Sequence, residues 1–234
     1  MSLTFTAQLH AFVYDEVQIR RFAELINASK ETHQLFISAR HKYQSEQDKA
    51  DDAKQIQNKH ISPKIIYQVT SEQFVQQVRR FERPVGYYKD RGEKVIPTEM
   101  MVIYCTTNPR DPQKAAKKLA GEMMAAAFDD NSSYFTNLDA RLTSCMMSSK
   151  GKTDLITIDI DDKAQYAEVR QFLREKGIAP IVVETRGGYH VMFHPCNEAG
   201  EVFQRFSKIH HMGDIFCPVP GTYQGGFPVR FIDD

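Results

Sequence analysis

Residues 155–162 read Leu-Ile-Thr-Ile-Asp-Ile-Asp-Asp, and this stretch decides the fold. Isoleucine occupies positions 156, 158 and 160, while Asp159 and Asp161 take the alternate positions. Strict alternation predicts a β-strand whose isoleucines face a core and whose two aspartates share the opposite face. Like charges at this spacing repel each other, so we expect a cation to compensate them.

The stretch opens a series of elements that apolar patterns predict for residues 153–234. These are a strand at 154–161, a helix at 164–176, strands at 180–185 and 189–194, a helix at 198–211 and a final strand at 229–232. The order βαββαβ is that of a ferredoxin-like or RRM-like unit. The first and third strands of such a unit are adjacent, so Asp159 and Asp161 should lie beside His190. The two helices cover one face of the sheet, and we expect these three residues on the other, open face.

The rest of the chain is expected to hold two further parts, which makes the whole an α+β protein. Residues 1–60 form a helical, largely polar N-terminal extension, with a helix over 15–40 capped by Asp15 and a solvated helix or linker over 41–60. Residues 61–152 form an α/β module with strands at 64–69 and 100–106. A short helix starts at Ser71, a longer one covers 113–128, and loops cover 129–152.

Composition limits the class of protein. The 234 residues carry no net formal charge, which neither supports nor excludes a nucleic-acid partner, because the distribution of charge decides this. The four cysteines are widely spaced without a CxxC pair, which fits a reducing, cytoplasmic setting. No apolar run of about 18 residues and no secretory signal is present, so we expect no membrane partner.

Three spaced motifs resemble those of the archaeo-eukaryotic primase superfamily, which includes primase-polymerases. They are Asp159-Ile160-Asp161, the Gly-Gly-Tyr-His of 187–190 and the later Asp214, and the Pro-Gly-Thr of 220–222 is similar to a segment seen after the third motif. The resemblance covers residues 153–234. It implies a catalytic core made of an N-terminal α/β module and an RRM-like module that carries the motifs.

The resemblance also implies roles for individual residues. Asp159, Asp161 and Asp214 would be the catalytic residues and the ligands of two divalent cations. The nucleotide-binding group would contain His190 at the phosphates, the glycines that let the backbone approach them, and arginine clamps: Arg186, Gly187, Gly188, Arg230 and, from the α/β module, Arg110.

The sequence departs from the family pattern at two places. Gly188 stands where the motif carries a serine, so a hydroxyl contact to phosphate is missing. Asp214 does not lie in a predicted strand, and Asp233 and Asp234 are alternative acidic residues.

The expected cofactor is Mg²⁺ or Mn²⁺ in a two-metal site, since phosphoryl transfer depends on charge neutralisation and alignment. Such ions prefer carboxylate oxygen and retain several waters. A zinc site is conceivable but not favoured, because the spacing of its candidate ligands is irregular: Cys196, His210, His211 and Cys217.

Each motif also has a purely structural interpretation. The aspartates can mark a strand end that runs into a helix, with Asp161 or Asp162 as its cap. The glycines can serve a hairpin turn, and His190 alone can be an ordinary histidine.

The leading hypothesis is a metal-dependent nucleotidyltransferase, a primase or primase-polymerase core that adds nucleotides from NTP or dNTP on a DNA template. Its expected partners are nucleoside triphosphates and single-stranded DNA, with a helicase or another replication protein as a further candidate, in a bacterial, plasmid or phage replication context. A non-catalytic nucleic-acid-binding or replication-initiator module of the same fold is the main alternative, although an acidic sheet face repels phosphate. A DxD hydrolase is the third, but Lys163 does not fit the haloacid dehalogenase pattern.

Overall fold

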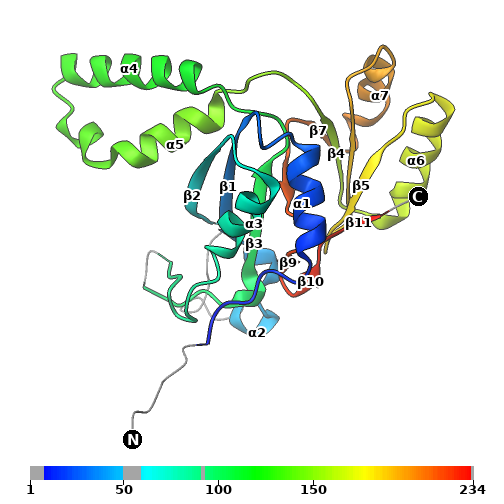
Figure 1. Ribbon diagram of the computed structural model, residues 1–234, viewed down its shortest axis with the longest axis horizontal. Helices are drawn as coiled ribbons and strands as arrows, with labels where there is room; N and C mark the ends of the chain where they lie inside the picture. Colours follow the sequence, from blue (N-terminus) through cyan, green and yellow to red (C-terminus); the bar gives the residue numbers. More distant parts are fainter. Residues whose placement is uncertain (1–7, 50–58, 91–92, 233–234) are drawn as a thin grey trace, which may run out of the picture.

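The computed structural model describes residues 8–49, 59–90 and 93–232 (Figure 1). The chain is a mixed α+β protein built on antiparallel sheets. Its helices are α1 (Glu16–Leu25), α2 (Glu46–Lys49), α3 (Ser71–Arg79), α4 (Pro112–Phe128), α5 (Leu138–Ser148), α6 (Tyr166–Glu175) and α7 (Ala199–Phe206). Its strands are β1 (Thr32–Ala39), β2 (Lys59–Tyr67), β3 (Met101–Thr106), β4 (Ile156–Ile160), β5 (Ile181–Glu184), β6 (Tyr189–Phe193), β7 (His211–Gly213), β8 (Phe216–Pro218), β9 (Tyr223–Gln224), β10 (Phe227–Pro228) and β11 (Arg230–Ile232).

The first sheet has the strand order β2-β1-β3-β8. Helices α1 and α3 pack against each other, and their apolar faces share one hydrophobic core with β1 and β3. The helix predicted over residues 15–40 is confirmed where α1 lies. It is wrong over Thr32–Ala39, where the chain forms the strand β1. Asn27 ends the helical region with a left-handed φ of 55°, and β1 follows as a central strand buried on both faces. A strand buried on both sides shows no apolar–polar alternation, so the sequence pattern of β1 does not distinguish it from a buried helix.

The second sheet has the order β11-β5-β6-β4-β7. The apolar faces of α6 and α7 form a second core with the isoleucines of β4 and with Val191 and Phe193 of β6. The predicted strands, the β5–β6 hairpin and the adjacency of β4 and β6 are confirmed. The expectation that the last strand completes the βαββαβ unit is wrong. The strand after α7 is the three-residue β7, which pairs with β4, and β11 pairs with β5 at the other edge.

The segment that follows α7 connects the two sheets, because β7 pairs in the second sheet and β8 pairs in the first. Strand β8 follows β7 closely but joins the first sheet, where Cys217 lies opposite Cys105. The core of the first sheet also includes Leu155, Val183 and Met192 from the second. Because of this shared core, the face of β4 and β6 that carries the aspartates lies against the first sheet instead of opening to solvent along its length.

Helices α4 and α5 form a long arm that projects from the side of the molecule (Figure 1). Residues 129–152, expected as loop, contain a 3₁₀ turn at Ser132–Asn137 and all of α5. Only a few side chains of α5, among them Leu142, Cys145 and Met146, pack toward α4, so its helical pattern is weak in the sequence. None of the helices in the described residues has the length and apolar character needed to cross a membrane.

Candidate functional site

The register of the second sheet brings Asp159 and His190 together. Asp159 on β4 lies directly opposite His190 on β6 and opposite His211 on β7, so all three residues share one row across the sheet. Asp159 Oδ1 is 3.3 Å from His190 Nε2. Asp161 follows the end of β4 and is largely exposed. The structure thus places the two aspartates and the histidine as the sequence predicted, next to each other.

These residues line a cavity of about 300 Å³ between the two sheets. The sheet face that carries them was expected to be open, but most of it is buried. Thr157 and Met192, two residues away from Asp159 and His190 on the same face, are fully buried. The cavity is the part of this face that stays accessible. Its walls carry both signs of charge, through Arg40, Lys42, Asp159 and Asp161, and His190 lies among them.

The basic wall of the cavity comes from residues that sequence reasoning assigned to a polar extension. Arg40 directly follows β1, and its Nη1 donates a hydrogen bond to Tyr104 Oη on β3 at 3.0 Å. Lys42 Nζ lies 3.9 Å from Asp161 Oδ1. The basic triplet Arg-His-Lys at 40–42 was the available signal. It was missed because β1 was not recognised as a strand that ends at this cavity.

The position of His190 sets its charge state. Burial lowers the pKa of the imidazole, and the nearby carboxylates of Asp159 and Asp161 oppose this effect while Lys42 adds to it. The Nδ1 atom is buried without a hydrogen-bond partner among the described residues. A buried polar atom without a partner costs free energy, so Nδ1 is a hydrogen-bonding group that the described residues leave unsatisfied.

The two glycines of the hairpin have different roles. Gly187 lines the cavity, and a Cβ added there would meet only ordinary contacts, with Lys42 Nζ at 3.7 Å and Asp161 Oδ1 at 3.8 Å. A Cβ on Gly188 would lie 1.7 Å from the carbonyl oxygen of Ile160. The Gly188 N–H donates to Thr185 Oγ1 at 3.1 Å and is used within the turn. Gly188 therefore allows the hairpin to pack against the end of β4, and the side chain of a serine at this position would collide with the Ile160 carbonyl.

Arg186 lies at the hairpin tip beside the cavity. Its guanidinium stacks over the ring of Tyr43 with its Cζ 4.5 Å from the ring centroid, and its Nη1 donates to the carbonyl of Gly225 at 2.8 Å. These contacts fix the side chain next to the cavity residues Gly187 and Gln224.

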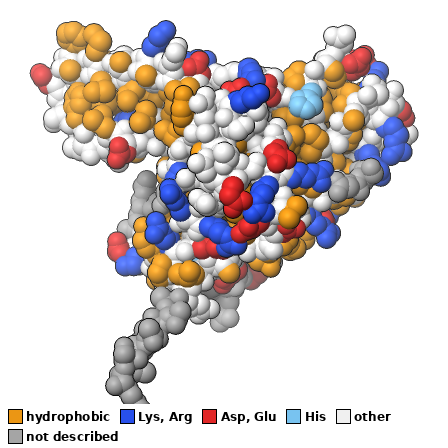
Figure 2. Space-filling view, in the orientation of Figure 1, with side chains coloured by type: hydrophobic (Ala, Val, Ile, Leu, Met, Phe, Trp, Pro, Cys, Tyr) orange, Lys and Arg blue, Asp and Glu red, His pale blue; other side chains and the backbone are white. Residues whose placement is uncertain are grey.

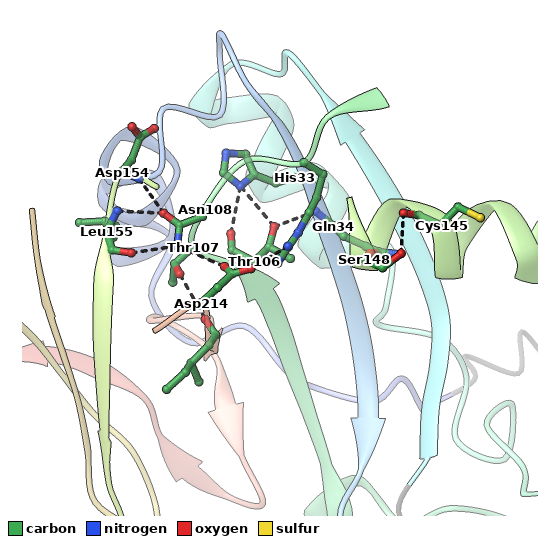
Figure 3. Close-up of polar contacts among 12 residues, drawn as sticks. His33, Gln34, Thr106, Thr107, Asn108, Cys145, Ser148, Asp154, Leu155 and Asp214 are labelled. Atoms are coloured by element: carbon green, nitrogen blue, oxygen red, sulfur yellow. Dashed lines mark hydrogen bonds and ion pairs between the residues drawn. The ribbon is translucent and has the colours of Figure 1, made fainter. Parts of the chain in front are cut away.

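Asp214 is not brought to the other two aspartates. Its Oδ2 accepts a hydrogen bond from Arg110 Nη1 at 2.7 Å. Its Oδ1 accepts one from Asn108 Nδ2 at 3.1 Å (Figure 3). Asn108 is fully buried and also binds the backbone of Asp154 and Leu155, where the chain enters β4. Asp214, Arg110 and Asn108 thus join the end of β3, the start of β4 and the end of β7 in one network.

Arg230 lies away from the cavity. It pairs with Glu184 on β5, with Nη2 to Oε2 at 2.7 Å, and Glu184 also accepts a hydrogen bond from Lys163. Because Val183 faces the first sheet, the neighbouring Glu184 points to the helix-covered side. The predicted phosphate clamp at Arg230 therefore has no support in this geometry.

The three metal ligands that the sequence predicts, Asp159, Asp161 and Asp214, are not assembled into one group. Among the residues that the structure describes, no group of three or more His, Cys, Asp or Glu side chains is arranged to hold a metal ion. The structural role expected of Asp162 is confirmed, because its carboxylate caps the turn before α6. Asp233 and Asp234, the alternative acidic residues, lie outside the described residues. Two carboxylates with substrate phosphates and water still suit Mg²⁺, which rarely has an all-protein cage.

Comparison of the chain with models of protein families, with curated proteins and with solved structures gives no match.

Proposed function

We propose that the chain is a metal-dependent nucleotidyltransferase, a primase or primase-polymerase core of the RRM-like type. The observation that carries this proposal is the cavity in which Asp159, Asp161 and His190 face Arg40 and Lys42. Carboxylates for divalent cations and basic groups for phosphates are the two requirements of nucleotide transfer from a triphosphate. The strand order β7-β4-β6-β5 supports the proposal, since it is the order expected of a βαββαβ unit.

Asp159 and Asp161 would hold Mg²⁺ or Mn²⁺, which when bound neutralises phosphate charge and activates the attacking hydroxyl. Lys42 supports this assignment in an indirect way. Its Nζ lies 3.9 Å from Asp161 in a largely exposed pair, a weak interaction that a divalent cation readily replaces. Lys42 would then be released to a phosphate oxygen.

Arg40 and His190 in the cavity, and Arg186 beside it, would orient the triphosphate. Arg40 is held by Tyr104, and its Nε is buried without a hydrogen-bond partner among the described residues. Arg186 is held by Gly225 and Tyr43. Guanidinium groups that are already held in place lose little conformational freedom on binding phosphate, which favours them as phosphate ligands. His190 would keep the Asp159 carboxylate in place through the 3.3 Å contact of its Nε2.

The proposal is tested first by isothermal titration of Mn²⁺ and ATP, separately and together, into the wild type and the Asp159→Ala/Asp161→Ala variant. We expect metal-dependent triphosphate binding that falls by more than about 100-fold in the variant. Asp162→Ala is the matched control, because it removes a neighbouring carboxylate that only caps a turn. Equal binding by the wild type and the double variant would refute the proposed site.

The alternative, a nucleic-acid-binding or replication-initiator module without catalysis, has one observation in its favour. The third acidic residue, Asp214, is paired with Arg110, which leaves two carboxylates at the cavity. Incorporation of labelled nucleotide with Mn²⁺ on primed and unprimed single-stranded DNA separates the two functions. Triphosphate binding without any incorporation would select the binding module.

A further inference from the structure

Helix α4 forms the outer edge of the arm and has one exposed face with large apolar side chains (Figure 1). Its inner face carries Ala115 and Leu119, which pack with α5, and the buried Ala126. Met124 and Phe128, one helical turn apart, lie on the opposite face and are 61 % and 83 % exposed. Figure 2 shows apolar side chains gathered over the arm. Exposed apolar groups gathered on a projecting element are typical of an interaction surface.

Gly121 lies on the same exposed face, one turn before Met124. Glycine is less favourable than alanine in the interior of a helix. A Cβ added at Gly121 would meet no atom within 4 Å, and the residue has no left-handed φ, so the fold of the single chain does not require a glycine here. Ala120 beside it is also small and exposed. The two residues leave room on the helix surface for a large side chain from another molecule.

The two ends of this face carry opposite charges. Lys117 lies one turn before Gly121, and Asp129 and Asp130 follow the last residue of α4. All three charged side chains are exposed, and none forms an ion pair with another residue in the part of the chain that the structure describes. Negative charge at a helix C-terminus is unfavourable, because this end of the helix dipole is itself negative. The final turn of α4 has no basic residue to offset it, so a cation from a second molecule would stabilise this end.

We propose that two copies of this chain form a dimer through the exposed faces of their α4 helices, which lie antiparallel and cross at Met124. A two-fold axis at Met124 places the residues four positions before it opposite the residues four positions after it in the other copy. Phe128 of each copy then packs on Ala120 and Gly121 of the other. The large side chain of one helix therefore meets the small residues of its partner, and the two Met124 side chains meet at the axis.

The same axis pairs the charges. Lys117 lies seven positions before Met124 and Asp130 lies six positions after it, so Lys117 of each copy faces Asp129 and Asp130 of the other. The contact is isologous, because each copy uses the same surface, and the assembly closes as a dimer. One pair of helices buries less area than a standard interface of about 1,600 Å², so we expect a dissociation constant in the micromolar range. The cavity of the candidate active site is not part of this contact, and the proposal is independent of the proposed function.

The first test is sedimentation velocity on the full chain. We expect the wild type to change from monomer to dimer between about 1 and about 100 µM, without larger species. Phe128→Asp should weaken the dimer by at least about 30-fold. Gly121→Leu should weaken it as strongly while the chain melts at the same or a higher temperature by circular dichroism, because leucine favours the helix but fills the space for Phe128. Lys208→Glu, beyond α7, is the control and should associate as the wild type does.

Charge reversal tests the antiparallel register. Lys117→Glu and Asp129→Lys/Asp130→Lys should each dimerise weakly alone, because like charges then face each other. In a 1:1 mixture of these two variants, both charge contacts again join opposite charges, so a heterodimer should form with about the affinity of the wild type. A mixture that associates no better than the separate variants would overturn the proposed register.

Cross-linking tests the position of the axis. Met124→Cys is made together with Cys196→Ser, which removes the exposed cysteine, while the other three cysteines are buried. A residue on a two-fold axis faces its own copy, so diamide should join two chains through the introduced cysteines. Ala167→Cys, exposed on α6, is the control and should remain monomeric in the same background.

Three results would overturn the dimer. The first is a wild type that stays monomeric at about 0.2 mM, which would leave the exposed face of α4 to a different protein. The second is association that grows beyond two copies, because the contact would then join two different surfaces. The third is equal cross-linking of the Met124→Cys and Ala167→Cys variants, because the disulfides would then form in random collisions.

Discussion

Replacing Gly188 by serine, the residue of the motif that the hairpin resembles, should destabilise the fold. The added Cβ would lie 1.7 Å from the Ile160 carbonyl oxygen. This is 1.3 Å closer than 3.0 Å, the distance below which real Cβ atoms essentially never approach another atom. The obstacle is backbone at the end of β4, so no side chain can rotate away to relieve it. Overpacking by flexible groups costs about 1–3 kcal/mol, and a contact with backbone should reach the upper end of this range or exceed it.

Urea unfolding followed by circular dichroism measures this loss for Gly188→Ser and Gly188→Ala. Gly187→Ala is the matched control, because its Cβ would make only ordinary contacts at 3.7 and 3.8 Å. We expect the control to remain within about 1 kcal/mol of the wild type. If Gly188→Ala were as stable as Gly187→Ala, the close packing of the hairpin on β4 would be refuted.

Three further predictions concern the groups around the site. Arg110→Ala should lower the free energy of unfolding in urea by about 3 kcal/mol, because it leaves Asp214 without its buried cation; a loss like that of exposed Arg141→Ala would contradict this. Asn108→Ala should cost about 3 kcal/mol, since the buried amide makes four hydrogen bonds; a near-neutral result in the same assay would rule out the network as a structural clamp. Burial opposes ionisation of Glu184, but its Lys163 and Arg230 partners prevail and hold its pKa below the usual 4.5. The ionised form therefore stabilises the fold above pH 4.5, and this contribution is lost as the pH falls through the folded-state pKa. Glu184→Gln should flatten the acid limb of stability between about pH 5 and 3, and an unchanged limb would refute the assignment.

The adjacency of Asp159 and His190 could be predicted because both strands have clear local patterns. Alternating isoleucines define β4, and the glycines at 187 and 188 define the hairpin that leads to β6. Once the order βαββαβ is recognised, pairing of the first and third strands follows. The same reasoning misplaced the last strand. β7 has three residues, too few to show an alternation of apolar and polar side chains. Its pairing with β4 depends on residues that are distant in the sequence.

The basic wall of the cavity could not be found in this way. Arg40 and Lys42 lie more than a hundred residues before Asp159, and they reach it because β1 is a central strand of the other sheet. The binding of Asp214 by Arg110 is equally non-local, and it removes from the cavity an aspartate that the motif pattern had placed there.

The sequence by itself determined the mixed α+β class, the strand that carries the two aspartates and the side of it on which they lie, because period-two alternation is a local property. Tertiary structure decided which strands form the edges of that sheet and which basic side chains face the aspartates. It also decided that Asp214 forms an ion pair with Arg110 away from them. These outcomes depend on how the two sheets pack around one shared core. Such packing brings together residues that are far apart in the sequence, and no local sequence pattern predicts these contacts.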